Sequence, residues 1–131
     1  SAQTVAGLKG KDGKDGKDGL AGAVYRVANY KNGGAGDATV ACADDDATSK
    51  KYTAIAGGVQ AGGVQSMGQT SEFDVAGSFP GRMDWNTGQP KANRLDGWIV
   101  LGSGGWSNTL KVWALCVPNT SIPVQQTDID N

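Results

Sequence analysis

Glycine occupies every third position from residue 7 to residue 22, in the run GLKGKDGKDGKDGLAG. Only glycine fits at the crowded axis of three wound polyproline-II chains, so this strict period is typical of a collagen triple helix. One chain cannot form a triple helix, and the repeat therefore predicts a trimer as the working unit. The alternative interpretation of the same run is a flexible linker of glycine, lysine and aspartate.

The repeat is short and contains no proline. At about 3.1 Å per residue it spans only ~45 Å. Lysine fills three X positions and aspartate the Y positions that follow them, but exposed ion pairs contribute only about 0–1 kcal/mol each. We therefore expect a stalk end that depends on the rest of the chain for trimerisation. The expected boundaries are 1–22 for the stalk, 23–124 for a C-terminal head and trimerisation domain, and 125–131 for a polar tail.

The head is predicted to be all-β. Its runs of Val, Ile, Thr and aromatic residues are short, clusters of Asn, Gly, Asp and Pro separate them, and no segment has a sustained helical period. Such spacing is typical of a compact sandwich or barrel. The expected strands are 24–30, 38–43, 52–55, 73–79, 97–101 and 109–117.

The chain has two cysteines, Cys42 and Cys116. An even count beside an extracellular type of repeat favours a disulfide between them. The bond would close a loop of about 75 residues, which contributes about 4.5 kcal/mol if it acts on the entropy of the unfolded chain. Two buried free thiols are the alternative.

The last predicted strand is apolar on both faces. The face opposite the expected core face carries Trp113 and Leu115, which are too apolar for a sheet surface in contact with water. The strand that contains Trp98 is also apolar on both faces. We therefore predict Trp113, Leu115 and Trp98 at a trimer interface. A second layer within the same chain is the alternative. The face expected to join the core consists of Leu110, Val112, Ala114 and Cys116.

The pentapeptide AGGVQ occurs twice in succession, at residues 56–60 and 61–65. It lacks the glycine spacing and the helical context of a phosphate-binding loop. We interpret it as structural: two tight turns, a bulged strand, or backbone packed closely against another chain.

The chain contains no histidine, which excludes Ser-His and Cys-His nucleophilic systems and histidine metal sites. We predict that it is not an enzyme and has no cofactor or metal. Asp44, Asp45 and Asp46 form a tight acidic cluster. A calcium site is one interpretation of this cluster, but it lacks the spaced ligands of an EF-hand loop, and a solvated turn is favoured.

Basic residues are the candidates for ligand binding. The stalk takes four of the 12 Lys and Arg residues and three of the 13 Asp and Glu residues, which leaves a slightly acidic head with eight and ten. Net charge therefore points to no polyanion, and a site for sulfate or carboxylate groups depends on local clustering. The candidate residues are Lys50, Lys51, Lys91, Arg94, Arg82 and Lys111.

Among the tryptophans, Trp85 is the best candidate for exposure, because its neighbours are polar residues and glycine. An exposed indole can stack on a sugar ring, although buried packing is the commoner role of tryptophan.

A collagen-like stalk followed by a small β head with two cysteines resembles the collagen-like surface proteins of bacteria and phages. The order Cys42, Gly57-Gly58, Gly97-Trp98 and Cys116 is similar to a pattern in secreted bacterial domains. The chain most resembles the C-terminal region of bacterial collagen-like adhesins, over its whole length in architecture. This resemblance implies a trimeric head that binds sulfated glycosaminoglycans and supports attachment, biofilm formation and virulence.

We therefore predict a homotrimeric, extracellular adhesin at the bacterial cell surface, with sulfated glycosaminoglycans or other anionic polysaccharides as partners. No apolar stretch of the chain approaches the ~20 residues of a membrane span, and we expect neither membrane insertion nor nucleic-acid binding. One alternative is a phage or prophage fibre or decoration protein whose head serves only for trimerisation. A second is a lectin that binds neutral sugars through Trp85.

Overall fold

The computed structural model describes residues 20–32, 34–61, 73–106 and 109–130. Within these residues the chain is all-β, as predicted, with antiparallel strands and one short helix. The elements are β1 (Val24–Tyr30), β2 (Gly34–Ala35), β3 (Ala38–Ala41), α3 (Asp46–Ser49), β4 (Thr53–Ala61), β5 (Asp74–Pro80), β6 (Met83–Asp84), β7 (Gln89–Pro90), β8 (Gly97–Ser103), β9 (Gly105–Trp106) and β10 (Leu110–Val117).

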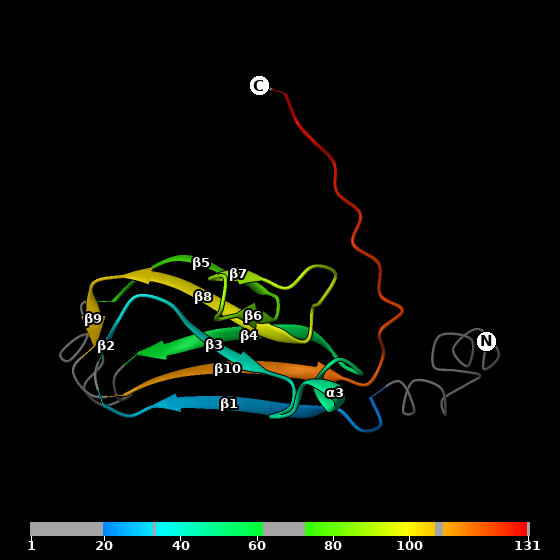
Figure 1. Cartoon of the computed structure of the whole chain (residues 1–131), viewed down its shortest axis with the longest axis horizontal. Helices are drawn as coiled ribbons and strands as arrows, with labels where there is room; N and C mark the ends of the chain where they lie inside the picture. Colours follow the sequence, from blue (N-terminus) through cyan, green and yellow to red (C-terminus); the bar gives the residue numbers. More distant parts are fainter. Residues whose placement is uncertain (1–19, 33, 62–72, 107–108, 131) are drawn as a thin grey trace, which may run out of the picture.

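Two three-stranded sheets form the body of the head, with the strand orders β1-β10-β4 and β3-β8-β5. Their long strands run along the long axis of the molecule (Figure 1). The pairs β2–β9 and β6–β7 add two small ribbons. Side chains from both large sheets meet in one buried cluster, so the sheets pack face to face. The cluster consists of Ala38, Val40, Cys42, Ala54, Val100, Leu110, Val112, Ala114 and Cys116.

Strand β10 is the central strand of its sheet and pairs with both β1 and β4. The predicted core face of β10 is confirmed, because Leu110, Val112, Ala114 and Cys116 are all 0% exposed. Side chains alternate between the two sides of a strand, so Trp113 and Leu115 lie on the outer side of the sheet. Trp113 is exposed there and Leu115 is half-buried.

The predicted disulfide between Cys42 and Cys116 is present. Cys116 belongs to β10, whereas Cys42 directly follows β3. The backbone amide of Cys42 also donates a hydrogen bond to the carbonyl of Asp96, at 3.0 Å. The disulfide therefore joins the two sheets across the core.

Strand β8 buries apolar side chains on both of its faces within one chain. On the inner face, the half-buried Trp98 packs against the core cluster. On the outer face, Ile99 is 0% exposed, and a Cβ atom at Gly81 would lie 2.9 Å from its Cδ1 atom. Gly81 leads into the β6–β7 ribbon, and Cβ of Pro90 in β7 lies 3.8 Å from the same Cβ position. Ile99 is therefore covered by a second layer of its own chain, which was the alternative to a trimer interface.

The first copy of the AGGVQ pentapeptide lies within strand β4, which extends to Ala61 and is longer than expected. A Cβ atom at Gly57 would lie 2.2 Å from Cδ2 of Trp98, so this glycine lets the indole lie against the strand. Trp98, predicted at the trimer interface, therefore has a packing partner in its own chain. The register between β10 and β4 shifts at Leu115 and Cys116, which makes β4 a bulged strand.

The predicted stalk up to residue 19, residues 62–65 of the second pentapeptide and Asn131 lie outside the described residues. The last triplet of the repeat forms a turn, in which the amide of Ala23 donates to the carbonyl of Leu20 at 3.0 Å. Gly22 has a φ of +81°, which favours glycine and differs from polyproline-II backbone. The segment 118–130 after β10 is exposed and lies outside the strands and helix, and its end runs away from the sandwich (Figure 1).

Candidate functional site

Five of the six predicted ligand-binding cations meet in one region, which we call the basic edge. Its members are Lys50, Lys51, Arg82, Lys91 and Arg94. Lys50 and Lys51 follow helix α3, Arg82 precedes β6, and Lys91 and Arg94 lie between β7 and β8. The sixth residue, Lys111, is in β10, where it pairs in register with Asn29 and Gln60. Lys111 therefore lies away from the basic edge, on the outer side of the sheet β1-β10-β4.

The acidic cluster begins the helix beside this edge. Asp45 is the N-cap of α3, and one of its carboxylate oxygens accepts a hydrogen bond from the amide of Thr48 at 2.8 Å. Such capping satisfies an amide that has no partner within the helix. Hydrogen bonding from Thr48 also lowers the pKa of Asp45 below its ordinary value. The turn expected at Asp44–Asp46 is thus the start of a one-turn helix.

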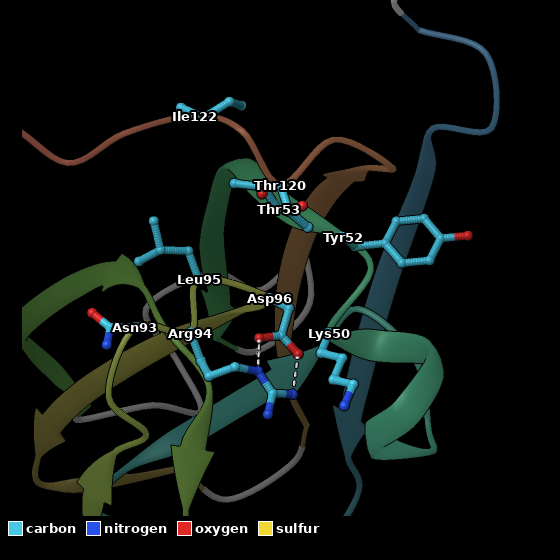
Figure 2. Close-up of a pocket in the computed structure, with 9 residues that line it drawn as sticks. All are labelled: Lys50, Tyr52, Thr53, Asn93, Arg94, Leu95, Asp96, Thr120 and Ile122. Carbon is cyan, nitrogen blue, oxygen red and sulfur yellow. Dashed lines mark hydrogen bonds and ion pairs between the residues drawn. The ribbon is translucent and has the colours of Figure 1, made fainter.

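Asp96 is the buried centre of the site and is 1% exposed. Its carboxylate accepts hydrogen bonds from Nε and Nη2 of Arg94, at 2.7 and 2.8 Å, and from the hydroxyl of Ser49 at 2.6 Å. Burial acts to raise the pKa of Asp96, but the hydrogen bonds from Arg94 and Ser49 outweigh it and hold the pKa below its ordinary value. Figure 2 shows Arg94 reaching this carboxylate with two nitrogens.

Asp46 is the second acceptor at the basic edge. Its carboxylate accepts from Nη2 of Arg94 at 2.9 Å and from Nζ of Lys91 at 3.2 Å. These two bonds lower the pKa of Asp46 to about 2. Arg82 donates to the buried hydroxyl of Ser49 at 2.8 Å. The network therefore binds the loop before β8 to helix α3 and to the start of β6.

A small pocket opens beside Arg94 and Asp96 and has a volume of about 110 Å³. Figure 2 shows Lys50 to the right of the Asp96 carboxylate and the Arg94 guanidinium. The residues that line the pocket are Lys50, Tyr52, Thr53, Asn93, Arg94, Leu95, Asp96, Thr120 and Ile122. Its charged lining residues are Lys50 and Arg94 of the basic edge and their acidic neighbour Asp96.

Asp46, Asp96 and Ser49 were not identified from the sequence as parts of this site. Arg94 and Asp96 are two residues apart, but that spacing is common and does not distinguish a buried ion pair from an exposed turn. Ser49 is 0% exposed although it belongs to a polar run. Its burial follows from the short helix, which the strand pattern did not predict.

The three neighbouring aspartates bind different partners. Asp44 pairs with Nη2 of Arg26, Asp45 caps the helix, and Asp46 accepts from Lys91 and Arg94. Over residues 20–32, 34–61, 73–106 and 109–130, no three His, Cys, Asp or Glu side chains gather closely enough to hold a metal ion.

The outer side of the sheet β1-β10-β4 is a second candidate site, which we call the open face. Tyr25, Val27 and Trp113 are 66%, 40% and 38% exposed there, and Leu115 lies between Tyr25 and Ala56 in register. The rings of Tyr25 and Trp113 meet edge to face, with centroids 6.3 Å apart. A hollow of about 410 Å³ lies beside them, over the small residues of β4.

A third candidate residue, Trp85, is 63% exposed and follows β6 in the β6–β7 ribbon. It lines a groove that also involves Arg26 and Asp44.

The chain has no match among family models, curated proteins or solved structures. In the part of the chain that the structure describes, none of the helices is both long and apolar enough to cross a membrane.

Proposed function

We propose that this chain is the non-enzymatic, homotrimeric head of a collagen-like adhesin at the cell surface. The observation that carries the trimer is the open face, an apolar surface on the sheet that contains β1. Large exposed apolar patches on small domains are typical of interaction sites. The Gly-X-Y repeat supplies the occupant of this face, because a triple helix brings two further copies of the same chain beside it.

The position of β1 supports this assignment. Val24 begins β1 five residues after Gly19, the last glycine of the repeat before the turn at residues 20–22. Gly19 and the strand are therefore at most about 17 Å apart along the chain. In a trimer, three β1 strands would therefore start near one three-fold axis. Tyr25 and Leu115 pair in register at this end of the sheet, so the apolar residues of the open face would lie close to the axis of such a trimer.

The hollow of the open face also supports the proposed interface. Ala56 and Gly58 are opposite Leu115 and Trp113 in register. A Cβ atom at Gly58 would have nothing within 4 Å, so the space over β4 is open in the single chain. A side chain from a neighbouring copy is the proposed occupant of this space, and its burial would exclude water from Trp113.

For the ligand, we propose sulfated polysaccharide at the basic edge. Lys50 and Lys51 are exposed at the end of α3, and the ion pairs of the edge are made by Arg82, Lys91 and Arg94. Sulfate groups would contact the two exposed lysines first. Three copies of a weak site on one trimer would raise the apparent affinity for a long chain by about 10²–10⁴.

The second candidate is a fibre head that only trimerises. It is favoured by the engagement of Arg82, Lys91 and Arg94 with Asp46 and Asp96, which leaves less positive charge for a ligand. Both candidates require the trimer, and they differ only in ligand binding.

Retention on immobilised heparin, at low and at physiological salt, separates the two candidates. The adhesin predicts retention at low salt that weakens as salt screens the charges. The double variant K50A/K51A should elute earlier, whereas K31A, which removes one exposed lysine after β1, should elute like the wild type. Light scattering on the same samples measures the mass of the assembly and shows whether it is a trimer.

A trimer that passes through the column at both salt concentrations would reject the adhesin and leave the fibre head. Retention that K50A/K51A leaves unchanged would reject the basic edge as the binding site.

A further inference from the structure

A groove of about 310 Å³ runs along the side of the sandwich, between the edge strands β1 and β3. It shares Val27 with the open face, and its lining includes none of the five cations of the basic edge. Its lining residues are Arg26, Val27, Ala28, Tyr30, Thr39, Val40, Ala41, Ala43, Asp44 and Trp85.

Side chains of β1 hold the two walls of the groove together. The Tyr30 hydroxyl donates to the carbonyl of Thr39 at 2.8 Å and accepts from its amide at 3.0 Å. Nε of Arg26 donates to the carbonyl of Ala41 at 3.1 Å. These bonds occupy the backbone edge of β3 that a further strand would otherwise pair with. The groove is therefore formed before any ligand arrives, which reduces the ordering cost of binding.

Arg26 and Asp44 place opposite charges at the rim. Nη2 of Arg26 pairs with Oδ1 of Asp44, whose side chain is 95% exposed. The guanidinium supplies N–H donors and the carboxylate supplies acceptors. The pair can therefore donate hydrogen bonds to some hydroxyl groups of a ligand and accept them from others. Because the two charges compensate each other, the groove favours an uncharged polar ligand over an anion.

Trp85 adds an apolar platform beside this pair. Its indole is 63% exposed, although tryptophan is usually well buried in a folded protein. The ribbon that carries it is held by the amide of Asn86, which donates to Oδ1 of Asp84 at 3.0 Å, and by the amide of Gly88, which donates to the carbonyl of Asp84 at 2.8 Å. The exposed ring is thus on an ordered turn.

We propose that this groove binds an uncharged pyranose, with the C–H face of the sugar on Trp85 and its hydroxyl groups on Arg26 and Asp44. A pyranose matches the site because one of its faces is apolar and its rim carries hydroxyl groups, and ligand sites combine an apolar surface with a few placed polar groups. The inference is independent of the polyanion proposal, since it uses different residues and a different ligand charge. A single stacking ring in an open groove supports binding of about millimolar affinity.

The test is an NMR titration of the full chain, in which the four tryptophan residues give four indole N–H signals. The probes are the methyl pyranosides of glucose, galactose, mannose and N-acetylglucosamine. At least one probe should move the Trp85 signal, identified by its absence in W85F, and leave the other indole signals in place. W85A should weaken binding by about tenfold, and W85F should restore most of it because it keeps an aromatic face.

Three results would overturn the proposal. The first is no movement of the Trp85 signal with any of the four sugars. The second is binding that W85A leaves unchanged. The third is binding abolished at about 0.5 M salt, which would mark a charge-driven contact. Heparin retention is measured separately and depends on Lys50 and Lys51, so failure of either proposal leaves the other standing.

Discussion

The outer sides of the two sheets differ. The outer side of β3-β8-β5, which we call the closed face, is covered within the chain at Ile99, where Gly81 and the β6–β7 ribbon exclude water. The open face of β1-β10-β4 carries residues of similar apolar character, yet Tyr25 and Trp113 are 66% and 38% exposed.

This difference separates two roles that the sequence pattern alone does not distinguish. Apolar residues on both sides of a strand require a second covering layer. On the closed face, the chain supplies that layer itself. On the open face, the described part of the chain supplies no such layer. Further copies of the chain are its proposed source, because the Gly-X-Y repeat precedes β1 in the sequence.

The largest expected effect on the stability of the single chain is at the closed face. Ile99→Ala removes a fully buried side chain and should lower the free energy of unfolding by about 2–5 kcal/mol. Urea unfolding at several protein concentrations measures it, and the loss should be the same at each.

Leu115→Ala is the matched change on the open face. Its effect should shrink when the protein is diluted into single chains, because part of its burial would come from neighbouring copies. Equal losses for both variants at every concentration would contradict the distinction between the faces.

The next largest effect on stability is expected from a substitution at one of two adjacent glycines. Gly57→Ala places a Cβ atom 2.2 Å from the Trp98 ring, and such overpacking costs about 1–3 kcal/mol. Gly58→Ala places its Cβ atom in open space on the other side of β4, and should leave single-chain stability within about 0.5 kcal/mol. Thermal unfolding of the two variants compares them directly. The reverse order of effects would mean that the assignment of the two sides of β4 is wrong.

A smaller loss of stability is expected in acid, and it concerns the basic edge rather than the open or the closed face. The pKa values of Asp46, at about 2, and of Asp96 are lowered in the folded chain. Their contribution to stability is therefore fully present above the unfolded value near pH 4 and is lost as the pH falls towards 2. Asp46→Asn should flatten this part of a stability–pH curve measured by circular dichroism. A curve that keeps the wild-type slope would show that Asp46 contributes nothing to it.

Much of the fold follows from local pattern. The alternation in residues 109–117 identified the core face of β10 because one side of a paired strand is buried throughout. The two cysteines, together with the extracellular type of repeat, were enough to favour a disulfide, although not to show that it joins two sheets. Helix α3 was not predicted, since a single turn is too short to show a helical period and depends on its Asp45 cap.

The candidate site was only partly predictable. The sequence identified the basic residues, and the fold brings five of them to one edge. It did not indicate that Asp46 would lie among them, because its contacts with Lys91 and Arg94 join residues 45 and 48 positions apart. Asp96 is only two residues from Arg94, but the sequence does not show that its carboxylate is buried. Likewise, the covering of Ile99 depends on the path of the chain from Gly81 through the β6–β7 ribbon, which strand periodicity does not describe.

Sedimentation velocity of the wild type and of two aspartate variants tests the central claim that copies meet on the open face. Val27, on the open face, and Val75, in β5 of the other sheet, are 40% and 48% exposed, so Val27→Asp and Val75→Asp are matched changes. The account predicts that the wild type and V75D sediment at three times the 13.4 kDa mass of the chain. V27D should sediment as the single chain, because the trimer would bury three unpaired carboxylates. A wild type that stays a single chain at every concentration, or a V27D trimer as stable as that of the wild type, would contradict the account.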